Sequence, residues 1–187
     1  MTERHHKILD AAIAVFSRYG LRKATMGDIA EQAGISRQTL YARYANKDEI
    51  MAAAMQRIAD QVCHEVRESW HPTQSLSEQL DLFLDCAIVR FFEQVRQMPD
   101  ASDLLTGQGE SGLSSQAMVE SGKIALLIEL FEPYADVLAA RGSNPSELAE
   151  FFFTTGVSFN FTARDLSHLT TLLGTLKLSA LTMLGEA

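Results

Sequence analysis

Residues 25–41 read TMGDIAEQAGISRQTLY, the pattern of two short helices joined by a tight turn at Gly34. Thr25 is a good N-cap, and Asp28 places a carboxylate at the positive end of the first helix. Gly34 stands where the chain must leave that helix, a position that often needs positive φ. Ser36 then caps a second helix. The spacing predicts a helix-turn-helix, whose second helix enters the major groove of duplex DNA.

The second helix of this motif begins with side chains that can reach DNA. Leu40 falls on its inner face, whereas the outward positions near its amino-terminal end hold Arg37, Gln38, Thr39 and Tyr41. A recognition helix presents this end to base edges. An ordinary helical hairpin in a bundle carries the same Ala-Gly turn, so the flanking sequence has to separate the two interpretations.

The flanking segments favour the DNA-binding interpretation. Apolar residues recur at helical spacing from Ile8 to Phe16, and Gly20 is expected to end this first helix. Downstream, Asn46 and Glu49 have the spacing of a capping box at the start of a long fourth helix. The segment therefore predicts three helices packed together, followed by a longer one.

Many positions in this segment match one known pattern in register. They are Ile8-Leu9-Asp10-Ala11-Ala12, Phe16, Gly20, Thr25-Met26, Ile29-Ala30, Ala33-Gly34-Ile35-Ser36, Thr39-Leu40-Tyr41, Tyr44 and Asn46-Lys47-Asp48. With these residues, the chain resembles the TetR family of bacterial transcriptional regulators over residues 5–55. The resemblance implies an all-α fold of about nine helices. It also implies a helix-turn-helix DNA-binding domain over residues 1–46 and an effector-binding and dimerisation domain over residues 47–187.

The resemblance also assigns roles at the DNA. Thr25 would donate to a phosphate at a helix amino terminus, and Arg43 and Lys47 would hold further phosphates. The groove face would be formed by Arg37, Gln38, Thr39 and Tyr41. Gln38 departs from the family pattern, which often has glycine there, and glutamine can make two hydrogen bonds to adenine. Tyr44 is expected to lie in the core. For Tyr41, a position in the core and a contact with DNA remain equally open alternatives.

Charge is distributed unevenly along the chain. The net charge of −8 alone disfavours a nucleic-acid partner. Residues 1–49, however, hold eight basic and six acidic residues, a balance of +2, and the remaining residues balance to −10. This segregation places the positive part of the chain where the motif lies and keeps the acidic part from the phosphates.

Composition limits the other possibilities. A chain of 187 residues with 47% hydrophobic residues and four prolines suits a DNA-binding unit plus a helical domain with its own core. Cys63 and Cys86 are too sparse for a disulfide framework, and no apolar run suits a membrane span, so a cytoplasmic protein without a membrane association is expected. No metal-ligand spacing or catalytic motif is present, so we expect no metal, no cofactor and no enzyme.

Helices continue beyond the motif. They are predicted over residues 47–70, 75–98, 123–140 with a bend at Pro133, 145–161 and 167–184. A short helix and a loose loop are expected between residues 100 and 122, because four glycines fall there.

Inward-looking positions of the middle helices predict an effector pocket. Their aromatic and methionine content favours a small molecule that is bulky and largely apolar or aromatic. The candidates are Met55, Ile58, Val62, Phe83, Cys86, Phe91, Met118, Leu127, Phe131, Phe152 and Phe159. Gln61, His64 and Asn160 are candidate polar anchors. Most of these residues are expected to be ordinary core, and only a minority of them to contact a ligand.

The last two helices are the expected interface of a homodimer, as the resemblance implies. In the helix at residues 145–161, the inner side is expected to hold Leu148, Phe151, Phe152, Thr155 and Phe159. That helix is apolar on more than one side and must be covered twice. The interface candidates are Phe153, Val157, Phe161, Leu172 and Leu176. The alternative is a core helix of a monomer.

These expectations combine into a ligand-responsive transcriptional regulator of the repressor type. As a dimer it would bind a near-palindromic, double-stranded operator, and a small effector would release it. The alternative on the same fold is a constitutive architectural or division-linked DNA-binding protein without an effector.

Overall fold

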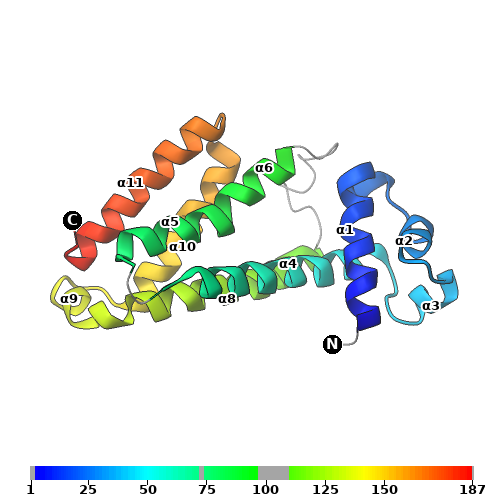
Figure 1. Cartoon of the computed structure of the whole chain (residues 1–187), viewed down its shortest axis with the longest axis horizontal. Coiled ribbons are helices and arrows are strands. Elements are labelled where there is room, and N and C mark those ends of the chain that lie inside the picture. The colour runs from blue at the N-terminus through cyan, green and yellow to red at the C-terminus, as the bar shows by residue number, and fades with distance from the viewer. Residues whose placement is uncertain (1–2, 72–73, 97–109, 187) are drawn as a thin grey trace. The chain divides into compact units, whose positions relative to one another are not determined.

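The computed structural model describes residues 3–71, 74–96 and 110–186, and this part of the chain is helical without any strand (Figure 1). It contains no helix both long and apolar enough to cross a bilayer. In chain order the elements are α1 (Glu3–Lys23), α2 (Met26–Ala33), α3 (Arg37–Tyr41), α4 (Lys47–Ser69), α5 (Leu76–Leu84), η1 (Asp85–Val89), α6 (Arg90–Arg96), α8 (Glu110–Phe131), η2 (Glu132–Tyr134), α9 (Ala135–Ala140), α10 (Pro145–Thr162) and α11 (Leu166–Leu184). The all-α prediction is confirmed.

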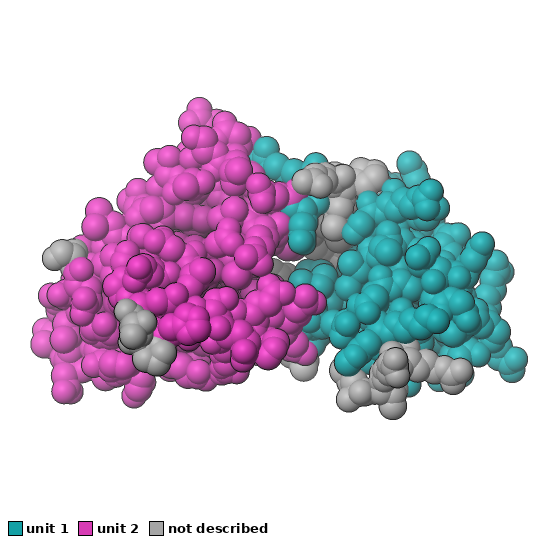
Figure 2. Space-filling view, viewed as in Figure 1, with its two compact units in different colours: residues 1–59, 94–119 teal, residues 60–93, 120–187 magenta. Residues whose placement is uncertain are grey.

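The chain forms two compact units, which Figure 2 shows in different colours. Unit 1 comprises residues 1–59 and 94–119, and unit 2 comprises residues 60–93 and 120–187. Helix α4 passes from one unit into the other. The division into domains at residue 46 stays a prediction, because it concerns which part binds DNA and which part binds an effector.

The core of unit 1 lies among α1, α2, α3 and the first turns of α4. Each helix contributes large side chains that are at most 1% exposed, namely Ile8, Leu9, Ile29, Leu40 and Ile50. Gly20, where the sequence predicts the end of the first helix, interrupts α1 with a kink at φ 79°, and the helix resumes as far as Lys23. The apolar spacing read from the sequence therefore corresponds to one shared core.

Local hydrogen bonds shape the turn between α2 and α3. At the start of α2, the Thr25 amide donates to Asp28 Oδ2 at 2.9 Å, and the Asp28 amide donates to Thr25 Oγ1 at 3.2 Å. Gly34 ends α2 with φ 66°, in the left-handed region that glycine adopts without strain. Ser36 Oγ accepts from the Thr39 amide at 3.1 Å and so caps α3. These are the caps that the sequence predicts.

Unit 2 is built around aromatic side chains. Phe83, Phe131, Phe152 and Phe153 are each at most 1% exposed. Phe83 meets Phe153 edge-on with ring centres 6.3 Å apart, and Phe131 meets Phe152 in the same way at 6.2 Å. Such pairs stabilise beyond their area of burial. The first pair joins α10 to α5, and the second pair joins α10 to α8.

The observed helices follow the predicted ranges with two differences. A π-helical turn over Asp85–Val89 interrupts the helix predicted at residues 75–98, and α8 begins at Glu110 instead of residue 123. The glycines do not break α8, and Gly122 lies beside Cys63, since a Cβ there would be in ordinary contact with Cys63 Sγ at 3.4 Å. Packing can outweigh the roughly 1 kcal/mol that a glycine costs inside a helix. The rest of the expected loop lies outside the described residues.

Two expectations on α10 are wrong. Phe151, expected on the inner side, is 56% exposed, whereas Phe153, expected off that side, is 1% exposed against Phe83. Successive residues of a helix point about 100° apart, so Phe152 can be central with either neighbour beside it. The position of α5 selects Phe153, and no pattern in α10 alone contains that information.

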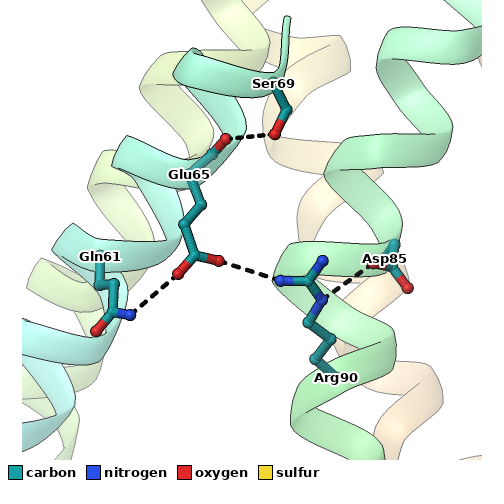
Figure 3. A network of polar contacts seen from close by, with 5 residues as sticks. All are labelled: Gln61, Glu65, Ser69, Asp85 and Arg90. Carbon is teal, nitrogen blue, oxygen red and sulfur yellow. Dashed lines mark hydrogen bonds and ion pairs between the residues drawn. The ribbon is translucent and has the colours of Figure 1, made fainter.

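A polar network joins α4 to the segment around η1 (Figure 3). Arg90 donates from Nε to Asp85 at 3.0 Å and from Nη1 to Glu65 at 3.1 Å. Glu65 also accepts from Gln61 Nε2 at 3.0 Å, and its backbone carbonyl accepts from Ser69 Oγ at 2.7 Å. Exposed ion pairs contribute only about 0–1 kcal/mol, so this network orients the two helices more than it stabilises them.

Candidate nucleic-acid interface

Helix α3 presents a short polar surface. Arg37, Gln38 and Tyr41 are exposed, and Tyr41 has 54% of its surface accessible. Thr39 is half-buried, and its hydroxyl lies 2.8 Å from Ser36 Oγ. The four predicted groove-facing residues therefore share one helix, and two of them, Gln38 and Tyr41, extend into solvent with uncharged side chains.

The guanidinium group of Arg37 rests against α2. A Cβ built on Gly27 would lie 2.7 Å from Arg37 Nη2, so only glycine leaves room for the side chain in this position. Hydrogen bonds from Thr25 lower the pKa of the Asp28 carboxyl group, and the charge of Arg37 lowers it further. Arg37 thus covers the first turn of α2, with its positive charge near the end of the motif that is expected to approach phosphates.

The three predicted phosphate ligands have protein partners in this structure. The Thr25 hydroxyl donates at 2.7 Å to the carboxylate that caps α2. Lys47 Nζ donates to the Leu21 carbonyl at 2.8 Å, at the carboxyl end of α1, and Arg43 Nε donates to His5 Nδ1 at 3.0 Å. Lysine carries three donors and arginine five, so Lys47 and Arg43 keep donors for a phosphate. The single hydroxyl proton of Thr25 is already in use.

His5 is a buried group that sequence reasoning did not predict. It is 7% exposed, and its Nδ1 accepts from Arg43 and lies 3.1 Å from the Tyr44 hydroxyl. Because Nδ1 accepts, the imidazole is neutral with its proton on Nε2, which has no partner among the described residues. Tyr44 is 6% exposed, which confirms its predicted core position. The cluster ties the first turn of α1 to the chain that follows α3.

Stability should fall on acidification because of His5. Burial, followed by the charge of Arg43, lowers the pKa of His5 from its ordinary value of 6.5. Below pH 6.5 the unfolded chain therefore binds more protons than the folded one, and stability is lost as the pH falls toward the folded pKa. The slope should reach at most about 1.4 kcal/mol per pH unit.

Urea titrations of wild type and His5→Gln between pH 7.5 and 5 measure this dependence. His5→Gln should flatten the profile, and the neighbouring His6→Gln serves as the matched control. Equal slopes in wild type and His5→Gln would exclude His5 as the source.

The predicted pocket residues are divided between the two units. Met55, Ile58 and Met118 belong to unit 1, and the Met118 side chain lies outside the described part. The others belong to unit 2. Those that are at most 4% exposed are Phe83, Cys86, Leu127, Phe131 and Phe152, and those that are half-buried are Val62, Phe91 and Phe159.

The three candidate anchors differ in burial. Gln61 and His64 are exposed, whereas Asn160 is 6% exposed on α10. Its Oδ1 accepts no hydrogen bond from the described residues. Buried polar atoms are nearly always paired, so an unpaired amide oxygen inside unit 2 indicates a place where a ligand or water can donate. Asn160 is the candidate anchor that this structure favours.

Comparison with known proteins agrees with this geometry. Residues 8–54 match the profile described as "Bacterial regulatory proteins, tetR family". TtgW of Pseudomonas putida, an uncharacterized HTH-type transcriptional regulator, is 30% identical over 131 residues, which cover 64% of this chain and 86% of that protein. YvdT of Bacillus subtilis, which carries the same description, is 29% identical over 82 residues, or 44% of this chain. The chain spans 42% of the length of YvdT and 40% of that of another curated relative.

A solved structure extends the likeness in fold to nearly the whole chain. The fatty acid degradation regulator FadR from Bacillus halodurans has a TM-score of 0.66 and 19% identity, over 97% of this chain and 96% of its own. Together with the exposed α3, these matches define a protein with an amino-terminal helix-turn-helix. The chain belongs to the TetR family.

Proposed function

We propose that this protein is a transcriptional repressor that binds a near-palindromic operator as a homodimer and leaves it when a small effector binds. The observation that carries the proposal is the exposed polar surface of α3, which is held in place by the buried Leu40. In this proposal Gln38 and Tyr41 read bases, because they extend into solvent with side chains that can lie flat against base edges. The backbone would be held by Arg37, Thr39, Arg43 and Lys47, and by Thr25 if its hydroxyl exchanges the Asp28 carboxylate for a phosphate.

Replacing Gln38 by alanine should weaken operator binding about tenfold or more, since a bidentate contact to adenine contributes about 1–3 kcal/mol. The salt dependence of operator binding should be the same in Gln38→Ala as in wild type, because this substitution removes no charge. Lys47→Ala should instead lower the slope of log affinity against log salt by about 0.9 per phosphate contact. Fluorescence anisotropy on a fragment selected from genomic DNA measures both quantities.

Gln32→Ala is the matched control, since Gln32 is exposed on α2, next to α3 in sequence. It should bind like wild type. If Gln38→Ala and Lys47→Ala also bind like wild type at every salt concentration, neither α3 nor the first turn of α4 is part of the DNA-binding surface.

The outer faces of α10 and α11 support a homodimer. Residues 151–162 carry no charge, and residues 166–184 carry one basic residue, Lys177, and no acidic one. Hydroxyls along this surface donate to carbonyls of their own helix, as Thr171 does to Ser167 at 2.9 Å and Thr175 to Thr171 at 3.1 Å. Hydroxyls that are bonded within their own helix can be buried in an interface without losing a hydrogen bond.

Four large apolar side chains of α10 and α11 are exposed, namely Leu166 at 41% and three that are more than half exposed. Phe151 is 56% exposed, Phe161 52% and Leu178 58%. Exposed apolar patches of this kind mark interaction sites. We place these three in the proposed interface. Of the other interface candidates, Phe153 and Leu176 are covered by their own subunit at 1% and 5% exposure, and Val157 and Leu172 are half-buried.

The effector is proposed to bind among the aromatic side chains of unit 2, near Asn160. Its signal would travel through α4, because the unit 2 part of α4 is joined to η1 by Arg90 and Glu65 (Figure 3). A displacement of η1 would therefore displace α4, whose first residue is Lys47. Coupling between two such sites typically amounts to about 1–3 kcal/mol.

A further inference from the structure

We propose that the effector is an amphipathic anion, a carboxylate on an apolar or aromatic body, whose charged end pairs with the ammonium group of Lys123. This inference rests on the proposed function, because it names the chemical class of the effector that unit 2 would bind.

Lys123 differs from the other basic side chains of unit 2 in its partners. Every other lysine or arginine there is bonded to a polar group, in the pairs Arg67 with Glu129, Arg90 with Asp85 and Glu65, Arg141 with the Thr182 carbonyl, Arg164 with His168, and Lys177 with Asp81. Lys123 makes neither a hydrogen bond nor an ion pair with any described residue. Its Nζ lies instead 5.8 Å from the ring centre of Phe153.

The surroundings of Lys123 are apolar. It is half-buried on α8 and faces α10, where Phe153 is 1% exposed. Phe153 in turn meets Phe83 of α5, and Cys63 of α4 lies against the neighbouring Gly122. Cys63 of α4 and Phe153 of α10 thus lie near the ammonium group of Lys123, and Phe83 of α5 packs against Phe153; all of these residues belong to unit 2.

The charge of Lys123 is compensated only in part, by Glu120, which lies three positions earlier on α8 and makes no hydrogen bond or ion pair with it. Burial lowers the pKa of its ammonium group, against the smaller opposite effects of Cys63 and Glu120. Burial also raises the pKa of the Cys63 thiol, so that this sulfur is neutral near pH 7. A partly desolvated cation without a hydrogen-bonded counter-charge is costly, and an anion that binds beside it would recover that cost.

The same geometry selects the kind of anion. A small hydrated anion would gain nothing from the aromatic rings of Phe83 and Phe153. A neutral apolar molecule would bury the ammonium group further without pairing it. A carboxylate attached to an alkyl or aryl body satisfies both features at once, with the head at Lys123 and the body against the rings.

Matched pairs of probes test this inference. Decanoate and 1-decanol form one pair, and 4-phenylbutyrate and 4-phenylbutanol form the other; the binding of each is measured by calorimetry at pH 7 with the 187-residue chain. At least one carboxylate should bind wild type about tenfold or more tightly than its alcohol, the increment expected from a charge-assisted hydrogen bond. Lys123→Met and Lys123→Gln should lose this preference and still bind the alcohol. Lys177→Met, which removes a lysine paired with Asp81, should keep it.

Three outcomes would overturn the inference: equal affinities within both pairs on wild type, a preference that survives in both Lys123 variants, or no binding of any probe. Thermal melts of both variants establish that they fold. Operator binding is measured in parallel on the same preparations. If wild type binds DNA but shows no preference for carboxylates, the inference fails while the DNA-binding role stands. Loss of DNA binding in wild type would instead contradict the proposed function.

Discussion

A variant carrying both Phe161→Asp and Leu178→Asp should be monomeric at micromolar concentration and should bind the operator at least about 100-fold more weakly than wild type. Both side chains are more than half exposed in the isolated subunit. Aspartates at these positions should therefore leave the fold intact while placing four charges into an apolar interface of two subunits. Two DNA-binding domains that are linked in a dimer bind a palindrome far more tightly than one domain does. Loss of the dimer should therefore lower the affinity for the operator.

Light scattering gives the mass, and anisotropy gives the operator affinity of the same sample. Val137→Asp is the control, since Val137 is 37% exposed on α9, outside the proposed interface. It should leave both mass and affinity unchanged. A double variant with the mass of a dimer would place the interface elsewhere.

Phe152→Ala should lower the free energy of unfolding by about 3–5 kcal/mol. Phe152 is fully buried on α10, and its ring meets Phe131 at 6.2 Å, so truncation leaves a cavity and removes an aromatic pair. The adjacent Phe151 is 56% exposed, and Phe151→Ala should cost less than about 1 kcal/mol.

Urea unfolding of both alanine variants, each combined with Phe161→Asp and Leu178→Asp, keeps dimer dissociation out of the measurement. The pair of neighbours is a sharp test, because it changes the same residue type in the same helix. Equal losses for Phe151→Ala and Phe152→Ala would show that α10 is rotated relative to the structure described here.

The helix-turn-helix could be predicted from sequence because its signals are local. The caps at Thr25 and Ser36 and the left-handed turn at Gly34 each involve residues within a few positions of one another. The start of α10 at Asn144 is equally local, and its side chain accepts from the Glu147 amide at 3.0 Å. The early start of α8 was missed for the opposite reason, since packing of Gly122 against Cys63, 59 positions earlier in the chain, offsets the preference of glycine for turns.

The local sequence thus determined the caps, the helices and the exposed amino-terminal end of α3, because these features depend on residues that are close together in the chain. The inward turn of Phe153, the pairing of His5 with Arg43, and the unpaired ammonium group of Lys123 depend on residues 30 or more positions away. No periodicity encodes such contacts. They arise when helices with several possible apolar faces pack, and packing selects one face for each.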